Sequence, residues 1–285
     1  MMLITSNEQL VEFIPNTMTS VKGELTLFEK MMPFLQKTEK WLEENFTSTE
    51  VMAVIANMEA EHPTRRLACN IIAVDAFYHA IPQLDVILTP NGFGIVSNSN
   101  LAPASKERVE RLMAALLQNR DSLLMQLMAI LPSFNGWTAS EQGMFFAATM
   151  FPSLKVTLRF PQQQENRWNQ YLAIREEAIA IEEFFAAQYV SKELLEVLRQ
   201  EVLTGQYRST THRRVCRILQ AVEMRCLTSN DPSSTMHFQH GDMSELVNTF
   251  RNLPEEFPEW HSSHTAELYQ PAVFENKKDS QGFWF

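Results

Sequence analysis

The stretch WLEENFTSTEVMAVI, residues 41–55, decides the fold, because a second stretch of the same chain lines up with it. That second stretch is FFAAQYVSKELLEVL, residues 184–198. In the first stretch, Thr47 is followed three residues later by Glu50, which is the spacing of a capping box. Each side chain of such a box covers the other's unpaired backbone amide, so the spacing predicts that a helix begins here.

Two further pairs of stretches repeat in the same order. They are TSNEQLVEF (5–13) with TASEQGMFF (138–146), and TRRLACNIIAVDAF (64–77) with THRRVCRILQAVEM (211–224). Across the three pairs the offset is about 133 to 147 residues, which is typical of an internal repeat. We therefore predict two tandem related helical units, residues 1–133 and 137–285, separated where Pro132, Asn135 and Gly136 break the helix.

Helical periodicity dominates the rest of the chain and predicts an all-α fold with one short hairpin. Two more helix starts are expected where Thr5 precedes Glu8 and where Thr138 precedes Glu141. Three apolar stripes have helical spacing: Leu67, Ile71, Val74, Tyr78, Ile81; Val109, Leu112, Met113, Leu116, Leu123, Leu127, Leu131; and Ile174, Ala178, Ile181, Phe185, Tyr189.

The exception is LTPNGFGIVSN, residues 88–98, which reads as a β-hairpin spanning 86–97. Its arms are 86–89 and 93–96, Pro90 and Asn91 take the turn, and Gly92 supplies a positive φ. The motif has no Gly-Lys-Ser/Thr for phosphate binding, no third glycine of a dinucleotide fingerprint and no serine between its glycines. It is either an ordinary surface hairpin or, because an isolated hairpin is marginal in water, a contact with another subunit.

Bulk composition narrows the functional classes. The chain has 285 residues, 45% hydrophobic and 20% charged, as in globular proteins, and a net charge of −10. That charge argues against general or sequence-specific nucleic-acid binding. We expect no secretory signal, no membrane span and no membrane partner. Three widely spaced cysteines predict buried thiols in a reducing cytoplasm.

The clusters of polar residues do not match the pattern of a catalytic or metal-binding site. The histidine pairs 237/240 and 261/264, near Asp242 and Cys226, lack the ligand patterns of zinc sites, so no metal or cofactor is expected. The glutamate pairs 43/44, 176/177 and 182/183 are expected on solvated helix faces, and no catalytic residue is predicted. The basic residues around 208–217 are expected to pair with glutamates on a solvated face, the alternative being contact with an acidic partner or nucleic acid.

Aromatic residues gather in the last part of the chain. Phe283, Trp284 and Phe285 follow a polar segment that begins after Val273 and Phe274. Such residues either fold back onto the chain's own core or anchor in the groove of a partner.

A resemblance rests on residues 81–112. An alanine-rich helix ends at Ile81-Pro82 and is followed by an apolar arm. Three motifs come next: Thr-Pro-x-Gly-Phe-Gly (89–94), Val-Ser-Asn (96–98) and Ala-Pro-Ala-Ser-Lys-Glu-Arg-Val (102–109). In this pattern the chain resembles a family of uncharacterised proteins from prophages of Bacteroides-type gut bacteria. The match is best over residues 1–131. The second half of the chain resembles the family only because it repeats the first half, and it lacks the Gly-Phe-Gly hairpin.

Such proteins look like the head–tail connector, or neck, proteins of tailed phages, which are helical units that form a ring beneath the portal. The resemblance implies a virion structural protein that acts by assembly without catalysis. Its implied partners are further copies of itself in a ring and other phage structural proteins such as portal or tail components. It would reside in the cytoplasm of the bacterial host and then in the virion.

A ring needs two different patches that meet head to tail. The residues expected at this interface are Asn91, Gly92, Phe93, Gly94 and Ile95 of the hairpin, with Phe283, Trp284 and Phe285 second. The alternative function is a soluble helical adaptor that binds a host or phage protein as a monomer or dimer. A deep pocket that gathers His212, His237, His240 and Cys226 would instead favour an enzyme.

Overall fold

A computed structural model describes most of the chain. The described residues are 2–14, 25–84, 86–89, 92–95, 105–161, 166–229 and 240–270. Their contacts divide the chain into two compact units, residues 1–176 with 203–205 and residues 177–202 with 206–285. The division therefore falls about 40 residues beyond the predicted boundary at 133–137, because the segments after Gly136 pack on the first unit's helices.

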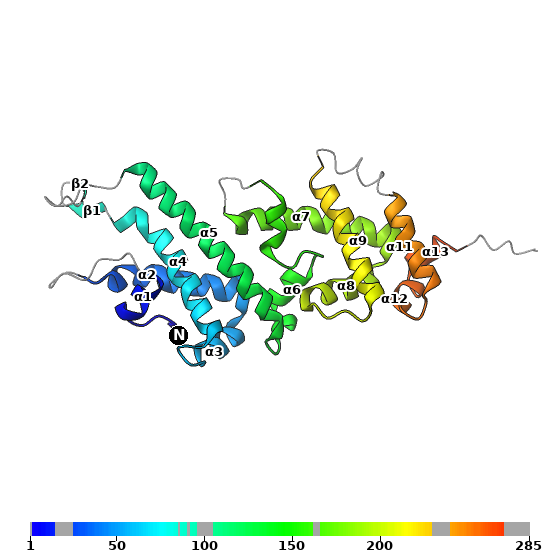
Figure 1. The fold of residues 1–285 in the computed structure, drawn as a ribbon, viewed down its shortest axis with the longest axis horizontal. Coiled ribbons are helices and arrows are strands. Elements are labelled where there is room, and N and C mark those ends of the chain that lie inside the picture. The colour runs from blue at the N-terminus through cyan, green and yellow to red at the C-terminus, as the bar shows by residue number, and fades with distance from the viewer. Residues whose placement is uncertain are drawn as a thin grey trace, which may run out of the picture. The chain divides into compact units, whose positions relative to one another are not determined.

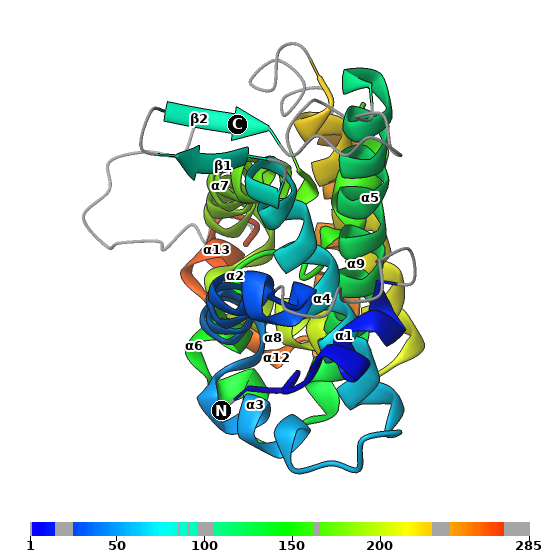
Figure 2. The ribbon, with the colours of Figure 1, turned by 90° about the vertical axis from the view of Figure 1, so that its left-hand side faces the viewer.

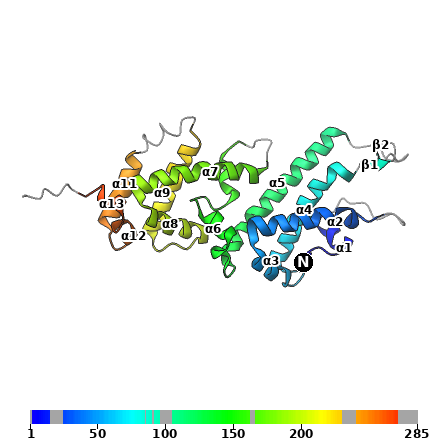
Figure 3. The same cartoon turned by 180° about the vertical axis from the view of Figure 1, so that it is seen from behind.

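The first unit is a helical bundle in which α4 packs against both α2 and α5 (Figure 1; Figure 3 gives the reverse view). Short π and 3₁₀ helices, labelled η, connect the longer helices. The helical elements are α1 (Asn7–Phe13), α2 (Leu27–Leu42), η1 (Glu43–Thr47), α3 (Thr49–Ala56), α4 (Pro63–Leu84), α5 (Lys106–Ile130), η2 (Leu131–Ser133), η3 (Trp137–Ala139), α6 (Glu141–Ala147), η4 (Leu154–Arg159) and the first part of α7 (Arg167–Phe185).

Two strands follow α4. Strand β1 (Val86–Thr89) pairs antiparallel with β2 (Gly92–Ile95), with Val86 opposite Ile95 and Leu88 opposite Phe93 (Figure 2). Gly92 is thus the first residue of a strand, although the sequence placed it in the turn. The predicted turn residues Pro90 and Asn91 and the continuation of the hairpin at 96 and 97 lie outside the described residues.

The second unit is a smaller helical assembly built around aromatic side chains. Phe185, Phe250, Phe257 and Trp260 are all buried in its core. Its elements are the second part of α7, η5 (Ala186–Val190), α8 (Lys192–Thr204), α9 (Thr210–Leu227), α11 (His240–Asn252), α12 (Pro258–His261) and α13 (His264–Glu267).

The predicted apolar stripes are largely core, with one exception. Ile71 and Val74 of α4 and Leu123 and Leu127 of α5 are buried, as expected for helices that face a common core. Near the start of α5, however, Leu112 is 43% exposed, so the second stripe is buried only in its later turns. Among the described residues, no helix is long and apolar enough to cross a bilayer.

The predicted helix starts are wrong by one or two residues. The structure caps α1, α3 and α6 with serines rather than with the predicted threonines, because each serine lies next to the first helical turn and its Oγ accepts from the amide three residues on. The capping box occurs instead at Thr26 and Glu29, at the start of α2. The three serine caps are Ser6, Ser48 and Ser140, in place of Thr5, Thr47 and Thr138.

Candidate functional site

A strained turn joins α2 to α3 in the first unit. The chain passes through the π-helix η1 and reaches Ser48, whose backbone has φ 74° and ψ 161°. This conformation is essentially restricted to glycine and costs about 1–3 kcal/mol, so the surroundings must hold it in place. The buried Ser48 side chain accepts a hydrogen bond from the Val51 amide at 3.4 Å and so begins α3.

An indole fixes this turn from the outside. Trp137 Nε1 donates to the Phe46 carbonyl at 2.7 Å, and Gln142 Nε2 donates to the Glu44 carbonyl at 2.9 Å. A π-turn leaves carbonyls without the usual helical partners, and these two side chains supply partners. The turn is therefore held by the segment from η3 to α6.

The second unit builds the same turn from different residues. Ser191 follows η5 with φ 74° and ψ 152°, is buried, and accepts from the Leu194 amide at 3.2 Å. Trp260 Nε1 donates to the Tyr189 carbonyl at 2.8 Å, and Thr265 donates to the Ala186 carbonyl at 2.9 Å. Each unit thus combines a π-helix, a strained serine and an indole lock.

A Trp-x-x-Ser motif carries both locks. Ser140 Oγ donates to the Trp137 carbonyl at 2.6 Å and caps α6, and Ser263 Oγ donates to the Trp260 carbonyl at 2.6 Å and caps α13. The sequence alignment missed this pair, because it matched the residues around Ser140 with the N-terminal stretch 5–13. A search for tryptophan three residues before a serine cap would have found it.

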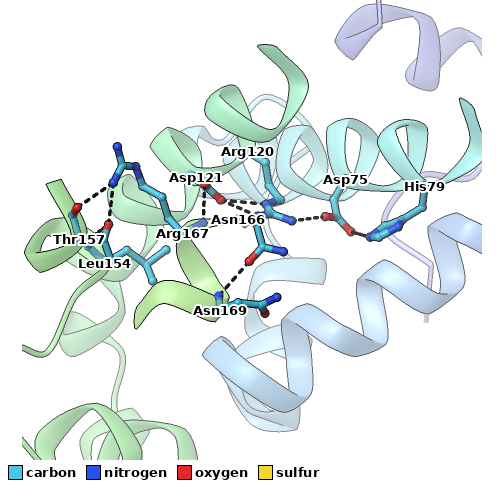
Figure 4. A network of polar contacts seen from close by, with 9 residues as sticks. All are labelled: Asp75, His79, Arg120, Asp121, Leu154, Thr157, Asn166, Arg167 and Asn169. Carbon is cyan, nitrogen blue, oxygen red and sulfur yellow. Dashed lines mark hydrogen bonds and ion pairs between the residues drawn. The ribbon is translucent and has the colours of Figure 1, made fainter. Parts of the chain in front are cut away.

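A buried arginine lies in the interior of the first unit, on α5. Arg120 is 3% exposed and lies between two carboxylates (Figure 4). Its Nη1 is 2.9 Å from Asp75 Oδ1, and its Nη2 and Nε are 2.7 and 3.0 Å from Asp121 Oδ1. Burial lowers the pKa of Arg120, but Asp121 and Asp75 outweigh that effect and raise it above its ordinary value.

Further residues satisfy the remaining carboxylate oxygens. Thr38 donates to Asp75 Oδ2 at 2.9 Å, and His79 Nε2 lies 3.6 Å from the same oxygen. Asp121 Oδ2 accepts from the backbone amide of Arg167 at 3.2 Å (Figure 4). Four elements, α2, α4, α5 and α7, meet at this network, which fixes their relative positions within the first unit.

A pocket of about 240 Å³ opens beside the network. Trp41 and Trp168 form aromatic walls whose ring centroids lie 6.3 Å apart, edge to face. Lys37 and His79 stand at its exposed margin, and the Arg120 guanidinium lies 5.8 Å from the centre of the Trp41 ring. Apolar walls with a few polar groups are typical of a binding site. The full lining is Phe34, Lys37, Thr38, Trp41, Asp75, His79, Arg120, Asn166, Trp168 and Asn169.

The second unit also contains buried charge. Glu182 is fully buried and accepts from Arg199 Nε at 2.6 Å, so the prediction of a solvated face is wrong for this residue. Glu223 is fully buried as well, and neither of its carboxylate oxygens has a hydrogen-bond partner. Burial raises the pKa of Glu223 well above its ordinary value, and the neighbouring Glu182 carboxylate raises it further.

The predicted basic cluster is partly buried. His212 is 1% exposed, its Nδ1 lies 3.0 Å from Glu201 Oε2, and its Nε2 lies 2.9 Å from the Glu256 carbonyl. The solvated face expected for the whole cluster is therefore wrong at His212, which α8 and the segment before α12 enclose. Arg208 and Arg214 pair with glutamates as predicted, at 2.6 Å from Glu259 and Glu245 respectively.

The surroundings of the cysteines and of several histidines indicate structural roles. Burial raises the pKa of Cys69 to about 11 and that of Cys216 to about 12, which makes both thiols poor nucleophiles. His261 Nε2 contacts the Phe250 carbonyl and His264 contacts Glu267. The described part of the chain holds no group of three side chains that could bind a metal, and His237 lies outside it.

The predicted interface residues are placed only in part. Gly92, Phe93, Gly94 and Ile95 form β2, of which the backbone pairing is known. Asn91 and the segment Phe283, Trp284, Phe285 lie outside the described residues. The sequence missed the Arg120 network and the pocket, because their members are scattered from Phe34 to Asn169 with no common motif.

The first unit matches a known protein family. Residues 24–147 match the sequence model of a family of unknown function, DUF6712. This range includes η1, Ser48, the β1–β2 pair, Arg120 and Trp137. No curated protein matches the chain, and no solved structure matches it.

Proposed function

We propose that this protein is a structural protein of a prophage, a head–tail connector component that acts by contact between copies and catalyses no reaction. The observation that carries the proposal is the pair of strands β1 and β2, which together form a sheet of two strands. A two-stranded hairpin is at best marginally stable in water and needs a surface to cover it. A neighbouring copy provides that surface in a ring.

The hairpin sequence is suited to such a contact. Val86, Ile87 and Leu88 on one strand face a Gly-Phe-Gly-Ile strand on the other. Phe93 and Ile95 supply apolar area, and each large side chain contributes roughly 1.5–3 kcal/mol when it is covered. Asn91, Gly92 and Gly94 complete the proposed contact segment. Phe283, Trp284 and Phe285 form a second contact element.

We further propose that the two units arose by duplication of one helical unit. The shared π-turn, strained serine and indole lock support this origin, together with the repeated sequence pairs 41–55 with 184–198 and 64–77 with 211–224. The pair 5–13 with 138–146 does not support it, because Trp137 and Gln142 hold the turn of the first unit. A duplicated chain carries two related but non-identical surfaces, which is what a head-to-tail contact requires. The partners are other copies in a ring and portal or tail components, in the cytoplasm of the host and in the virion.

The test is the variant Phe93→Ser, with Leu112→Ser as the matched control. Leu112 is an exposed apolar residue of α5, so both changes remove one apolar side chain. We expect Phe93→Ser to lower the mass measured by light scattering while helical circular dichroism stays at the wild-type level. Leu112→Ser should leave both unchanged. If Phe93→Ser unfolds the chain or leaves its mass unaltered, the hairpin is not the assembly contact.

The adaptor remains a second candidate, and the pocket lined by Trp41 and Trp168 favours it. A pocket of about 240 Å³ is suited to a single large side chain of a partner protein. An adaptor would bind that partner as a monomer or dimer. A wild-type chain that never exceeds the mass of a dimer would support the adaptor over the connector.

A further inference from the structure

The pocket beside Arg120 combines aromatic walls with polar groups at its margin. Its walls are the indoles of Trp41 and Trp168 with the ring of Phe34. At about 240 Å³ it is smaller than the roughly 300–1,000 Å³ typical of sites for whole small molecules, so it is suited to one side chain. Aromatic walls favour an aromatic occupant, because edge-to-face ring pairs contribute beyond area burial.

The polar groups around the pocket are mainly hydrogen-bond donors. Lys37 on α2 offers an ammonium, and the side-chain amide of Asn169 on α7 is exposed at the margin. Asn166 Oδ1 already accepts from the Asn169 backbone amide at 2.9 Å, which leaves Nδ2 as the donor end of that side chain. Donors at the mouth of an aromatic pocket fit the backbone carbonyls of an extended peptide.

One segment of this chain has the matching chemistry. Residues 271–285 lie beyond the described part of the chain and contain Phe274, Phe283, Trp284 and Phe285. Four aromatic residues in fifteen compare with 10% in the whole chain. Fully extended, such a segment reaches about 50 Å, which is ample for contact with a neighbouring molecule.

We infer that the pocket lined by Trp41, Trp168 and Lys37 binds an aromatic side chain from residues 283–285 of a second copy. The inference rests on the proposed function, since in a head-to-tail assembly each copy gives one element and receives another. The pocket takes the tail rather than the hairpin, because it has room for a single side chain, whereas the apolar residues of the hairpin are distributed over both strands.

The test uses the full-length chain with Phe283, Trp284 and Phe285 all changed to serine, so that its own tail cannot occupy the pocket. A fluorescent peptide of residues 271–285 is titrated onto this protein and followed by anisotropy. We expect saturable binding, and no binding of the peptide that carries the same three serines. Absence of binding by the wild-type peptide would overturn the inference.

Pocket variants locate the binding site. Asn169→Trp places an indole at the pocket margin, and Lys37→Glu reverses a charge there. Both variants should lower the affinity for the peptide by about tenfold or more, as expected when an anchor pocket is blocked. The controls are Ala173→Trp and Lys40→Glu, exposed positions about one turn along the same helices and outside the pocket, which should bind normally. Equal binding by Asn169→Trp and wild type would contradict the inference.

The solution mass separates this inference from the proposed function. If the wild-type chain assembles and Asn169→Trp assembles equally well, the connector proposal stands and the pocket inference fails. If the wild-type chain stays monomeric while the peptide binds in trans, the assembly proposal fails and so does the assignment of the occupant to a second copy. Loss of both assembly and peptide binding in Asn169→Trp supports both.

Discussion

The two units of this protein share a turn but differ in the charged side chains that they bury. Each unit holds a serine at φ 74° after a π-helix and locks the turn with an indole on a carbonyl. The first unit also buries Arg120 with two carboxylates, those of Asp75 and Asp121, and all three side chains are hydrogen-bonded. The second unit buries Glu182 with Arg199 and adds Glu223, whose oxygens have no partner.

The comparison distinguishes features that both units share from features that are particular to one unit. A strained backbone persists only where its surroundings over-determine it, and in both units an indole donates to the equivalent carbonyl, two residues before Ser48 and before Ser191. The buried charges obey no such repetition, since Arg120 lies between two carboxylates whereas Glu223 lies beside another carboxylate, Glu182. The first unit's network also borders a pocket, whereas Glu223 is fully buried. The turn is thus common to the fold of both units, whereas the buried charged residues differ from one unit to the other.

The largest expected loss of stability comes from removing the buried guanidinium of Arg120 in the first unit. Arg120→Met leaves Asp75 and Asp121 buried without their counter-ion, which costs about 3–5 kcal/mol in comparable pairs. We expect a correspondingly lower urea midpoint for the transition of the first unit. Arg214→Met is the control, because this 71% exposed partner of Glu245 contributes less than about 1 kcal/mol. Equal losses in the two variants would mean that the network is not stabilising.

The second unit should show the opposite behaviour in Glu223→Gln. The pKa of Glu223 lies well above its ordinary value of 4.5, so between the two values the folded state holds a proton that the unfolded chain has lost. Wild-type stability therefore falls as pH rises through that window, by about 1 kcal/mol per pH unit for one proton. The glutamine does not titrate, so the variant should match wild type below pH 4.5 and exceed it increasingly above.

Urea unfolding at several pH values measures this slope. Glu196→Gln is the matched control, since Glu196 is an exposed glutamate of α8 in the same unit. A stability difference between Glu223→Gln and wild type that shrinks with rising pH would contradict the assignment of a neutral buried Glu223.

The smallest effects test what the units share. Ser48→Ala keeps the positive φ and loses the cap oxygen, so it should destabilise by about 1–2 kcal/mol. Ser48→Gly loses only a few tenths of a kcal/mol of capping but relieves about 1–3 kcal/mol of backbone strain, so it should stabilise. The same two changes at Ser191 should give the same signs in thermal unfolding. Opposite signs at the two positions would break the comparison.

Sequence patterns predicted the helices better than the contacts between them. The stripes of α4 and α7 follow from apolar spacing alone, and Ile71, Val74, Ile174 and Ala178 are buried as that spacing requires. The serine caps were misplaced, because a capping-box pattern does not reveal that Thr47 belongs to a π-turn.

The candidate site could not be predicted from local patterns. Arg120 meets Asp75 across 45 residues, and Trp137 meets Phe46 across 91, so neither contact leaves a signal at helical spacing. Likewise Glu182 looks like one half of a solvated Glu-Glu pair until Arg199 and Glu223 are seen beside it. Such contacts depend on how helices pack, which single-chain periodicity does not specify.

The central claim is assembly, and the most direct measurement is the mass of the purified wild-type chain by light scattering over a concentration series. The account predicts a discrete species heavier than a dimer of the 32.9 kDa chain, which grows with concentration and which Phe93→Ser reduces. A mass that does not exceed that of a dimer at any concentration would contradict it.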